Sequence, residues 1–228
     1  MSLYELANLE KLSENKVHLM EYPSSYYEDW QDRKTEFLKS SAAPDFIKDI
    51  LIYKSKKRPH LFFGEAYVAM RLGGSTNQGW FNSWDWISSY DWSKGIYKSN
   101  DPFIFDMMHQ FYKDALHKHL IKKLPKILDI QRRFLLKPQP PDLWLIDRNN
   151  EHHFIEVKRG NDRLSEEQIL GLLLINAILR HNIHIVWLYE EGTRPPSYGK
   201  IGKHIDTFNK LKDKLSEVMG QSSSFGEK

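Results

Sequence analysis

Residues 141–168 have the sequence PDLWLIDRNNEHHFIEVKRGNDRLSEEQ, and this stretch decides the predicted fold. Its apolar and β-branched residues predict one strand over 142–146 and a returning strand over 152–158. Asp147-Arg148-Asn149-Asn150 between them is typical of a turn. The stretch therefore predicts a β-hairpin followed by a capped helix.

Charged residues stand at defined places on this hairpin. Asp142 opens the first predicted strand, and Glu156 and Lys158 are two residues apart on the second. Because successive strand residues alternate between two faces, Glu156 and Lys158 share a face and Val157 points the opposite way. Carboxylates with a lysine beside them could hold a divalent metal next to a stabilising cation, as in nucleases. Simple charge alternation on a solvent-facing strand is the competing explanation, and the apolar residues around the motif disfavour it.

Composition limits the function classes. The chain has 228 residues, 40% hydrophobic and 28% charged, which is ordinary for a soluble globular protein. The absence of cysteine excludes disulfides, cysteine zinc sites and thiol nucleophiles. No segment approaches the roughly 18 apolar residues of a membrane span, and acids occupy the N-terminus where a signal peptide needs an apolar core. We therefore expect a cytoplasmic site of action and no membrane partner. A net charge of +3 argues only weakly for nucleic acid.

The predicted fold class is mixed α/β (α+β), with a small mixed sheet flanked by helices. Residues 1–60 are expected to form a helical N-terminal extension, with helices over 26–39 and 45–53. The main domain is expected over 61–190, with an aromatic insertion at 75–106 and a core at 133–190. Residues 191–228 are expected to form a C-terminal helix and a flexible tail.

Residues 61–73 predict a short amphipathic helix that ends at Gly73-Gly74. Glu65 lies on its apolar side, where a carboxylate is costly to bury without a partner. Glu65 is therefore a candidate third metal ligand. The alternative is an edge residue favoured by the helix dipole, and Glu36 is a more distant competitor for the ligand role.

Two segments are candidate DNA contacts. The insertion at 75–106 carries Trp80, Trp84, Trp86 and Trp92, which could stack on unpaired bases or form a small aromatic core. Residues 107–137 hold eight Lys or Arg against two acids, and the basic region from Lys113 to Lys137 is the best candidate for phosphate contacts. A solvated helix face explains that charge equally well.

Taken together, Pro141-Asp142, thirteen intervening residues, Glu156-Val157-Lys158 and then Asn161-Asp162-Arg163-Leu164-Ser165-x-x-Gln168 resemble the core of the PD-(D/E)xK nucleases, in the VRR-NUC branch. The resemblance is close over 140–190 and looser over 61–73. It implies a restriction-endonuclease-like fold and Mg²⁺- or Mn²⁺-dependent hydrolysis of DNA phosphodiesters, often at flaps or branches in repair or replication.

The resemblance also implies site residues. The catalytic set is Asp142, Glu156, Lys158 and Gln168, and the metal ligands are Glu65, Asp142, Glu156 and the Val157 carbonyl. Gln168 has a second interpretation as half of an S-x-x-Q capping box with Ser165. Asp162 and Arg163 are expected to order a loop or to contact phosphate.

Alternatives of biological role stay open. The same chemistry occurs in antibacterial DNase toxins, which would imply an immunity protein as partner. A DNA-binding module that has lost catalysis is a further alternative, and a homodimer that cuts both strands of a junction is compatible with the sequence.

Overall fold

The computed structural model describes residues 17–58, 60–81, 90–91, 96–97, 138–179 and 181–222. The chain forms two compact units. The first consists of Met1–Ser83, Pro141–Arg163 and His181–Ser197, and the second of Trp84–Pro140, Leu164–Arg180 and Tyr198–Lys228. None of the helices in the described ranges is both long enough and apolar enough to cross a membrane.

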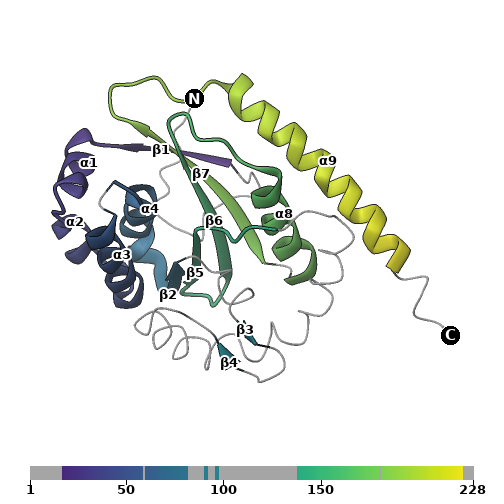
Figure 1. Ribbon diagram of the computed structural model, residues 1–228, viewed down its shortest axis with the longest axis horizontal. Coiled ribbons are helices and arrows are strands. Elements are labelled where there is room, and N and C mark those ends of the chain that lie inside the picture. The colour runs from purple at the N-terminus through teal and green to yellow at the C-terminus, as the bar shows by residue number, and fades with distance from the viewer. Residues whose placement is uncertain are drawn as a thin grey trace. The chain divides into compact units, whose positions relative to one another are not determined.

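The first unit is built on a five-stranded sheet (Figure 1). In spatial order its strands are β1 (Val17–Tyr22), β7 (Asn182–Glu190), β6 (His152–Arg159), β5 (Leu143–Asp147) and β2 (Thr76–Phe81). β7 runs parallel to both β1 and β6, whereas β5 is antiparallel to β6 and to β2. The sheet is therefore mixed, and the predicted mixed α/β class is confirmed at this level.

The predicted hairpin is β5 followed by β6. β5 is rich in apolar residues and every one of its residues is buried, and β6 is buried along all but its two end residues. The Asp147 carboxylate accepts hydrogen bonds from the backbone N–H groups of Asn149 and Glu151, which holds the turn closed. Asn150 takes the left-handed φ of 61°, a conformation that asparagine tolerates. The turn chemistry thus sets the register in which Leu143 pairs with Ile155.

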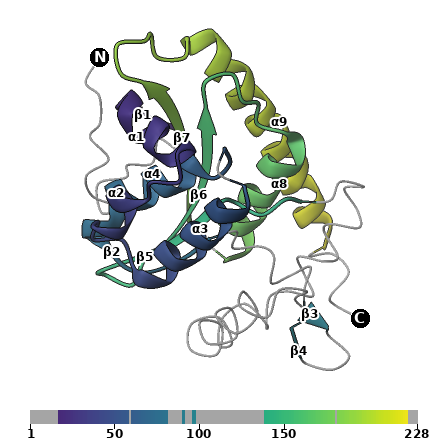
Figure 2. The ribbon, with the colours of Figure 1, turned by 60° about the vertical axis from the view of Figure 1, so that its left-hand side comes forward.

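Helices α1 (Ser24–Gln31), α2 (Glu36–Lys39), α3 (Asp45–Lys57) and α4 (Phe63–Leu72) belong to the same unit and lie together beside the sheet (Figure 2). A short 3₁₀ turn, η2 (Gly73–Ser75), joins α4 to β2. Gly64 lets α4 approach β6, because a Cβ there would lie 2.9 Å from Val157 Cγ1. This close approach determines where the helix presents Glu65.

The second unit contains α8 (Glu166–Leu174), the π-helical turn η3 (Ile175–Leu179), α9 (Tyr198–Ser222) and the paired strands β3 (Tyr90–Asp91) and β4 (Ile96–Tyr97). α8 and α9 pack against each other (Figure 1). The sequence predicted both helices, and the S-x-x-Q box begins α8 as expected.

Several elements differ from the prediction. Within the expected helical extension, β1 is a parallel edge strand with alternating burial, which corrects the helical prediction for these residues. Within the expected insertion, β2 pairs with β5 and so belongs to the core sheet. The predicted helix over 26–39 is broken where Arg33 has a φ of 63°. The segment 107–137, which includes the start of the core expected at 133–190, lies outside the described residues.

Candidate active site

Asp142 and Glu156 face each other at the open end of the β5–β6 hairpin. The ladder pairs Leu143 with Ile155, so the next residues along the two strands are Asp142 and Glu156. Directly opposed residues of an antiparallel pair have their side chains on the same face. The Asp142 carboxylate is fixed there by a 2.7 Å hydrogen bond from the Val157 backbone N–H. The hairpin therefore brings together the two acids that the motif predicted.

Lys158 completes this group from the same strand. Glu156 is fully buried and Lys158 is 7% exposed. Lys158 Nζ lies 2.7 Å from Glu156 Oε1, which is ion-pair distance. Burying two charges is expensive, and their attraction offsets that cost only where further hydrogen bonds satisfy the remaining polar atoms.

Those further hydrogen bonds are missing at Glu156. Within the described part of the chain, no hydrogen bond accompanies the 2.7 Å ion pair between Lys158 and the Glu156 carboxylate. Burial, and then the Asp142 charge, raise the pKa of Glu156 well above its usual value. Burial also raises the pKa of Asp142 to about 6, against the opposing effect of the Val157 N–H. Two adjacent carboxyls in this state must share a proton or bind a cation.

Glu65 joins the group from the first turn of α4. Burial, and then the Asp142 charge, raise the pKa of Glu65 to about 8. The negative charge of ionised Glu65 is therefore also destabilised in this setting. Glu36, the competing candidate, is an exposed residue paired with Lys39 at 3.2 Å. The structure thus favours Glu65 over Glu36 as the helix carboxylate.

Glu65, Asp142 and Lys158 line a common pocket of about 300 Å³. Its lining includes His60, Leu61, Phe62, Phe63, Gly64, Glu65, Asp142, Val157, Lys158, Arg159 and Asp162, all of which belong to the first unit. Phe62 has a φ of 66°, in the left-handed region that an aromatic residue rarely adopts. Strained backbone of this kind concentrates at functional sites. Here it lies three residues before Glu65.

The donor set fits a hard divalent cation. Mg²⁺ and Mn²⁺ prefer oxygen ligands, and among the described residues the two buried oxygens of Glu156 accept no hydrogen bond beside the ion pair with Lys158. A bound cation would also relieve the repulsion that raises the pKa values of Glu65 and Asp142. Val157 lines the pocket and holds Asp142 through its N–H, while the role of its carbonyl as a ligand stays a prediction.

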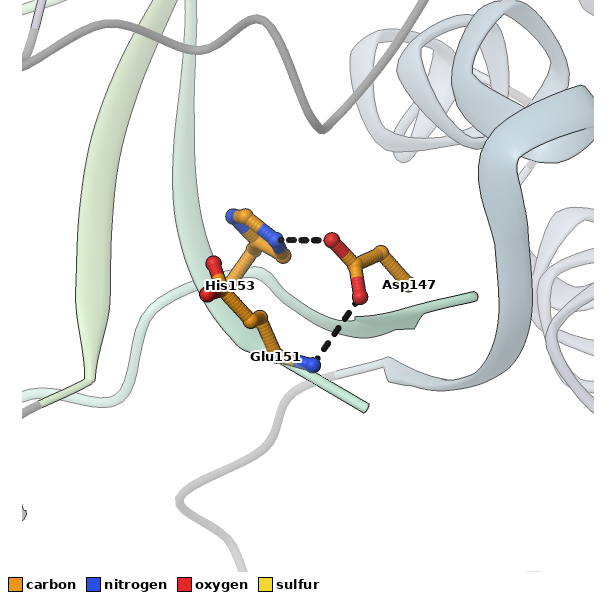
Figure 3. Close-up of side chains that lie close together, drawn as sticks. All are labelled: Asp147, Glu151 and His153. Carbon is orange, nitrogen blue, oxygen red and sulfur yellow. Dashed lines mark hydrogen bonds and ion pairs between the residues drawn. The ribbon is translucent and has the colours of Figure 1, made fainter. Parts of the chain in front are cut away.

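A second cluster lies at the closed end of the hairpin (Figure 3). One ligand atom each of Asp147, Glu151 and His153 lie within 4.8 Å of one another, a spacing that a metal ion could bridge. Both Asp147 oxygens are already satisfied, by the N–H groups of Asn149 and Glu151 and by His153 Nε2 at 3.2 Å. This contrast with Glu156 assigns the cluster a structural role in closing the turn.

The cluster continues as a line of buried histidines across the sheet. His153 Nδ1 lies 3.2 Å from His184 Nε2, and His184 Nδ1 lies 3.3 Å from His18 Nε2. Although burial acts to raise the pKa of Asp147, its hydrogen bonds bring that pKa below the usual value, so it accepts from His153. The direction of the two hydrogen bonds between the histidine rings depends on their tautomers, and all three rings are buried.

Gln168 takes the structural role of its two interpretations. Its side-chain oxygen accepts a 3.0 Å hydrogen bond from the Ser165 N–H, and the Ser165 hydroxyl accepts one of 3.2 Å from the Gln168 N–H. This capping box commits the Gln168 oxygen to α8. Asp162 proves to be a loop-ordering residue, because its carboxylate accepts a 2.9 Å hydrogen bond from the Arg159 N–H.

Sequence reasoning missed Arg159 and the aromatic residues around it. Arg159 directly follows the E-x-K motif and lines the pocket, and its partner Tyr27 lies 132 residues earlier. Adjacency to the motif was the available signal for Arg159, whereas nothing in the sequence indicated Tyr27. The basic region from Lys113 to Lys137, and most of the aromatic insertion, lie outside the described residues.

Comparisons with known proteins give no family for this chain. No family model matches it, and neither the curated proteins nor the solved structures contain a significant match. Functional inference therefore depends on the residues and the geometry of the pocket.

Proposed function

We propose that this protein is a divalent-metal-dependent nuclease that hydrolyses DNA phosphodiester bonds. The observation that carries the proposal is the fully buried Glu156 carboxylate, whose 2.7 Å ion pair with Lys158 is accompanied by no hydrogen bond among the described residues and which lies beside Asp142. A stable protein retains such a group only when a ligand compensates for it or when function requires it. The sheet with its flanking helices is compatible with the PD-(D/E)xK fold that the sequence resemblance implies.

Glu65, Asp142 and Glu156 would hold Mg²⁺ or Mn²⁺ with their carboxylate oxygens. When bound, the ion would polarise the phosphate and lower the pKa of the attacking water. The Val157 N–H fixes the orientation of Asp142. Gly64 permits the close packing of α4 on β6 that positions Glu65.

Lys158 is the residue best placed to act on the phosphate itself. It lines the pocket, and only 7% of its surface is exposed. In this water-poor setting its ammonium can neutralise the charge that builds on the phosphate oxygens in the transition state. An ammonium held there can alternatively orient the attacking water.

DNA as the substrate, with selectivity for flaps or branches in repair or replication, follows from the sequence resemblance. The pocket supports this proposal through its chemistry, because it combines an acidic cluster with the basic side chains of Lys158 and Arg159. A phosphodiester needs both a cation site for its oxygens and positive charge along its backbone.

The test uses purified full-length protein with linear, flapped and four-way DNA, in Mg²⁺, in Mn²⁺ and in EDTA. We expect cleavage only with metal, and loss of cleavage in Glu156→Gln and Lys158→Met. Glu36→Gln is the matched control, because that residue is an exposed helical glutamate away from the pocket. Cleavage that survives in Glu156→Gln would exclude the proposed site. Binding without cleavage in either metal would instead support the inactive DNA-binding module.

A further inference from the structure

Arg159 is a pocket residue to which the proposed catalytic chemistry gives no role. It is the last residue of β6 and follows Lys158 directly, so the two side chains leave the strand on opposite faces. Both nevertheless line the same pocket. The site thus carries two adjacent cations that point in different directions.

An aromatic cradle fixes the Arg159 guanidinium. Its Cζ lies 4.0 Å from the centroid of the Tyr27 ring and 5.7 Å from that of Phe63. Nη2 also donates a 3.2 Å hydrogen bond to the Tyr27 hydroxyl. The two rings contact each other edge to face, with centroids 5.1 Å apart. A guanidinium stacked in this way is pre-organised, so it loses little entropy when it binds an anion.

Within the described ranges, the charge of Arg159 has no carboxylate partner, unlike that of Lys158. Among the described residues, no carboxylate lies within ion-pair distance of the guanidinium, whereas Lys158 has Glu156 at 2.7 Å. The nearby Asp162 carboxylate binds the Arg159 backbone N–H at 2.9 Å. The side-chain partners of the guanidinium are instead the phenols of Tyr27 and Tyr22, which are neutral acceptors.

From this geometry we infer that Arg159 binds a phosphate group of the DNA next to the scissile one, and so positions the strand for cleavage. The inference rests on the proposed nuclease function. A planar fork of N–H donors matches two phosphate oxygens, which an ammonium cannot do in the same way. Lys158 then faces the reacting phosphate and Arg159 its neighbour. Arg159 is a positioning residue.

The same chemistry fits two sources of phosphate, an internal phosphodiester and a terminal 5′-monophosphate. Substrates of one sequence separate them. One carries a neutral methylphosphonate next to the cleaved bond, and another carries a 5′-hydroxyl in place of the 5′-phosphate. We expect the methylphosphonate to weaken binding by the wild type and to have little further effect in Arg159→Gln. The reverse dependence, on the 5′ end alone, would overturn the assignment to an internal phosphate.

The kinetic test compares full-length Arg159→Gln, Arg159→Lys and Tyr27→Leu with the wild type. Loss of a charge-assisted contact to phosphate is expected to raise KM and Kd by about 10- to 100-fold while kcat stays within a few fold. The salt dependence of binding in EDTA should fall by about one phosphate contact in Arg159→Gln and should persist in Arg159→Lys. Tyr27→Leu, which removes the cradle, should show part of the same loss.

Arg148→Gln is the matched control, because Arg148 is an exposed arginine at the hairpin turn that donates to the Gly74 carbonyl at 2.6 Å. It should leave KM unchanged, and thermal unfolding should show that every variant is folded. Wild-type KM, Kd and salt slope in Arg159→Gln would overturn the inference, as would a loss confined to kcat. A wild type that binds DNA but never cleaves refutes the proposed function, and the binding measurements then still decide the role of Arg159.

Discussion

Replacing Glu156 by glutamine should abolish the proposed DNA cleavage and stabilise the metal-free protein. The carboxylate is fully buried, and within the described chain its oxygens accept no hydrogen bond. Burial, and then Asp142, raise its pKa in the folded state. A carboxyl with a raised folded pKa contributes stability below its unfolded pKa, and that stability is lost as the pH rises towards the folded pKa. Glutamine has the shape of the protonated acid and does not titrate, so the variant should not lose this stability as the pH rises.

The magnitude follows from proton linkage. When the folded protein retains one proton that the unfolded chain has lost, the free energy of unfolding falls by about 1.4 kcal/mol for each unit by which the pH rises. In EDTA, Glu156→Gln should match the wild type near pH 4.5, the usual value for glutamate. As the pH rises further, the free energy of unfolding of Glu156→Gln should exceed that of the wild type by up to about 1.4 kcal/mol more per pH unit. For a chain of this size, 1 kcal/mol corresponds to roughly 2–4 °C in Tm.

Metal should reverse this order. Mg²⁺ or Mn²⁺ at a hundredfold excess over its Kd stabilises a folded protein by about 2.7 kcal/mol, and only the wild type should show that gain. The assay is thermal and denaturant unfolding from pH 4.5 to 8, with EDTA or with metal, and with Glu36→Gln as the control. A stability difference that does not change with pH, or equal stabilisation of Glu156→Gln by metal, would refute the reasoning.

Four further predictions test how the fold supports the site. Gly64→Ala should lower kcat/KM by about 10- to 100-fold, because its Cβ would lie 2.9 Å from Val157 Cγ1 and displace α4. Gly74→Ala is the control, because the space around its Cβ is open, and it should retain the wild-type kcat/KM. Burial lowers the pKa of His18 from 6.5 to about 4. As the pH falls from 6.5 to 4, the free energy of unfolding of the wild type should therefore decrease by up to roughly 3 kcal/mol, and denaturant titrations should show a smaller decrease in His18→Gln. Asp147→Ala should reduce the free energy of unfolding by about 1–3 kcal/mol through its lost turn hydrogen bonds, and unchanged cleavage per folded molecule will separate this role from metal binding. Gln168→Ala should cost about 1 kcal/mol through the lost capping box, and a fall in kcat beyond about tenfold would restore its catalytic interpretation.

Local patterns in the sequence were sufficient to predict the centre of the fold. The β5–β6 hairpin follows from the apolar and β-branched residues on either side of an Asp-Arg-Asn-Asn turn. The start of α8 follows from its capping box, and the helix that carries Glu65 follows from its apolar face and its terminal glycines. These signals depend on neighbours within a few residues, so they survive without tertiary information.

Edge strands were not predictable in the same way. β1 and β2 are short, and each is stabilised by hydrogen bonds to a partner far along the chain, β7 and β5 respectively. Their own sequences are only weakly β-like, because pairing and packing against neighbours decide strand formation more than intrinsic preference does. For this reason the expected helical extension contains β1 and the expected aromatic insertion contains β2, and both strands belong to the sheet.

The sequence by itself determined which residues could carry the chemistry, because the motif fixes Asp142, Glu156 and Lys158 on one hairpin. Only the tertiary structure decided their state. Burial raises the pKa of Glu156, close packing at Gly64 brings Glu65 to the same pocket, and Tyr27 from α1 holds the Arg159 guanidinium. Desolvation and contacts between distant segments are properties of the folded chain, so no reading of local spacing could supply them.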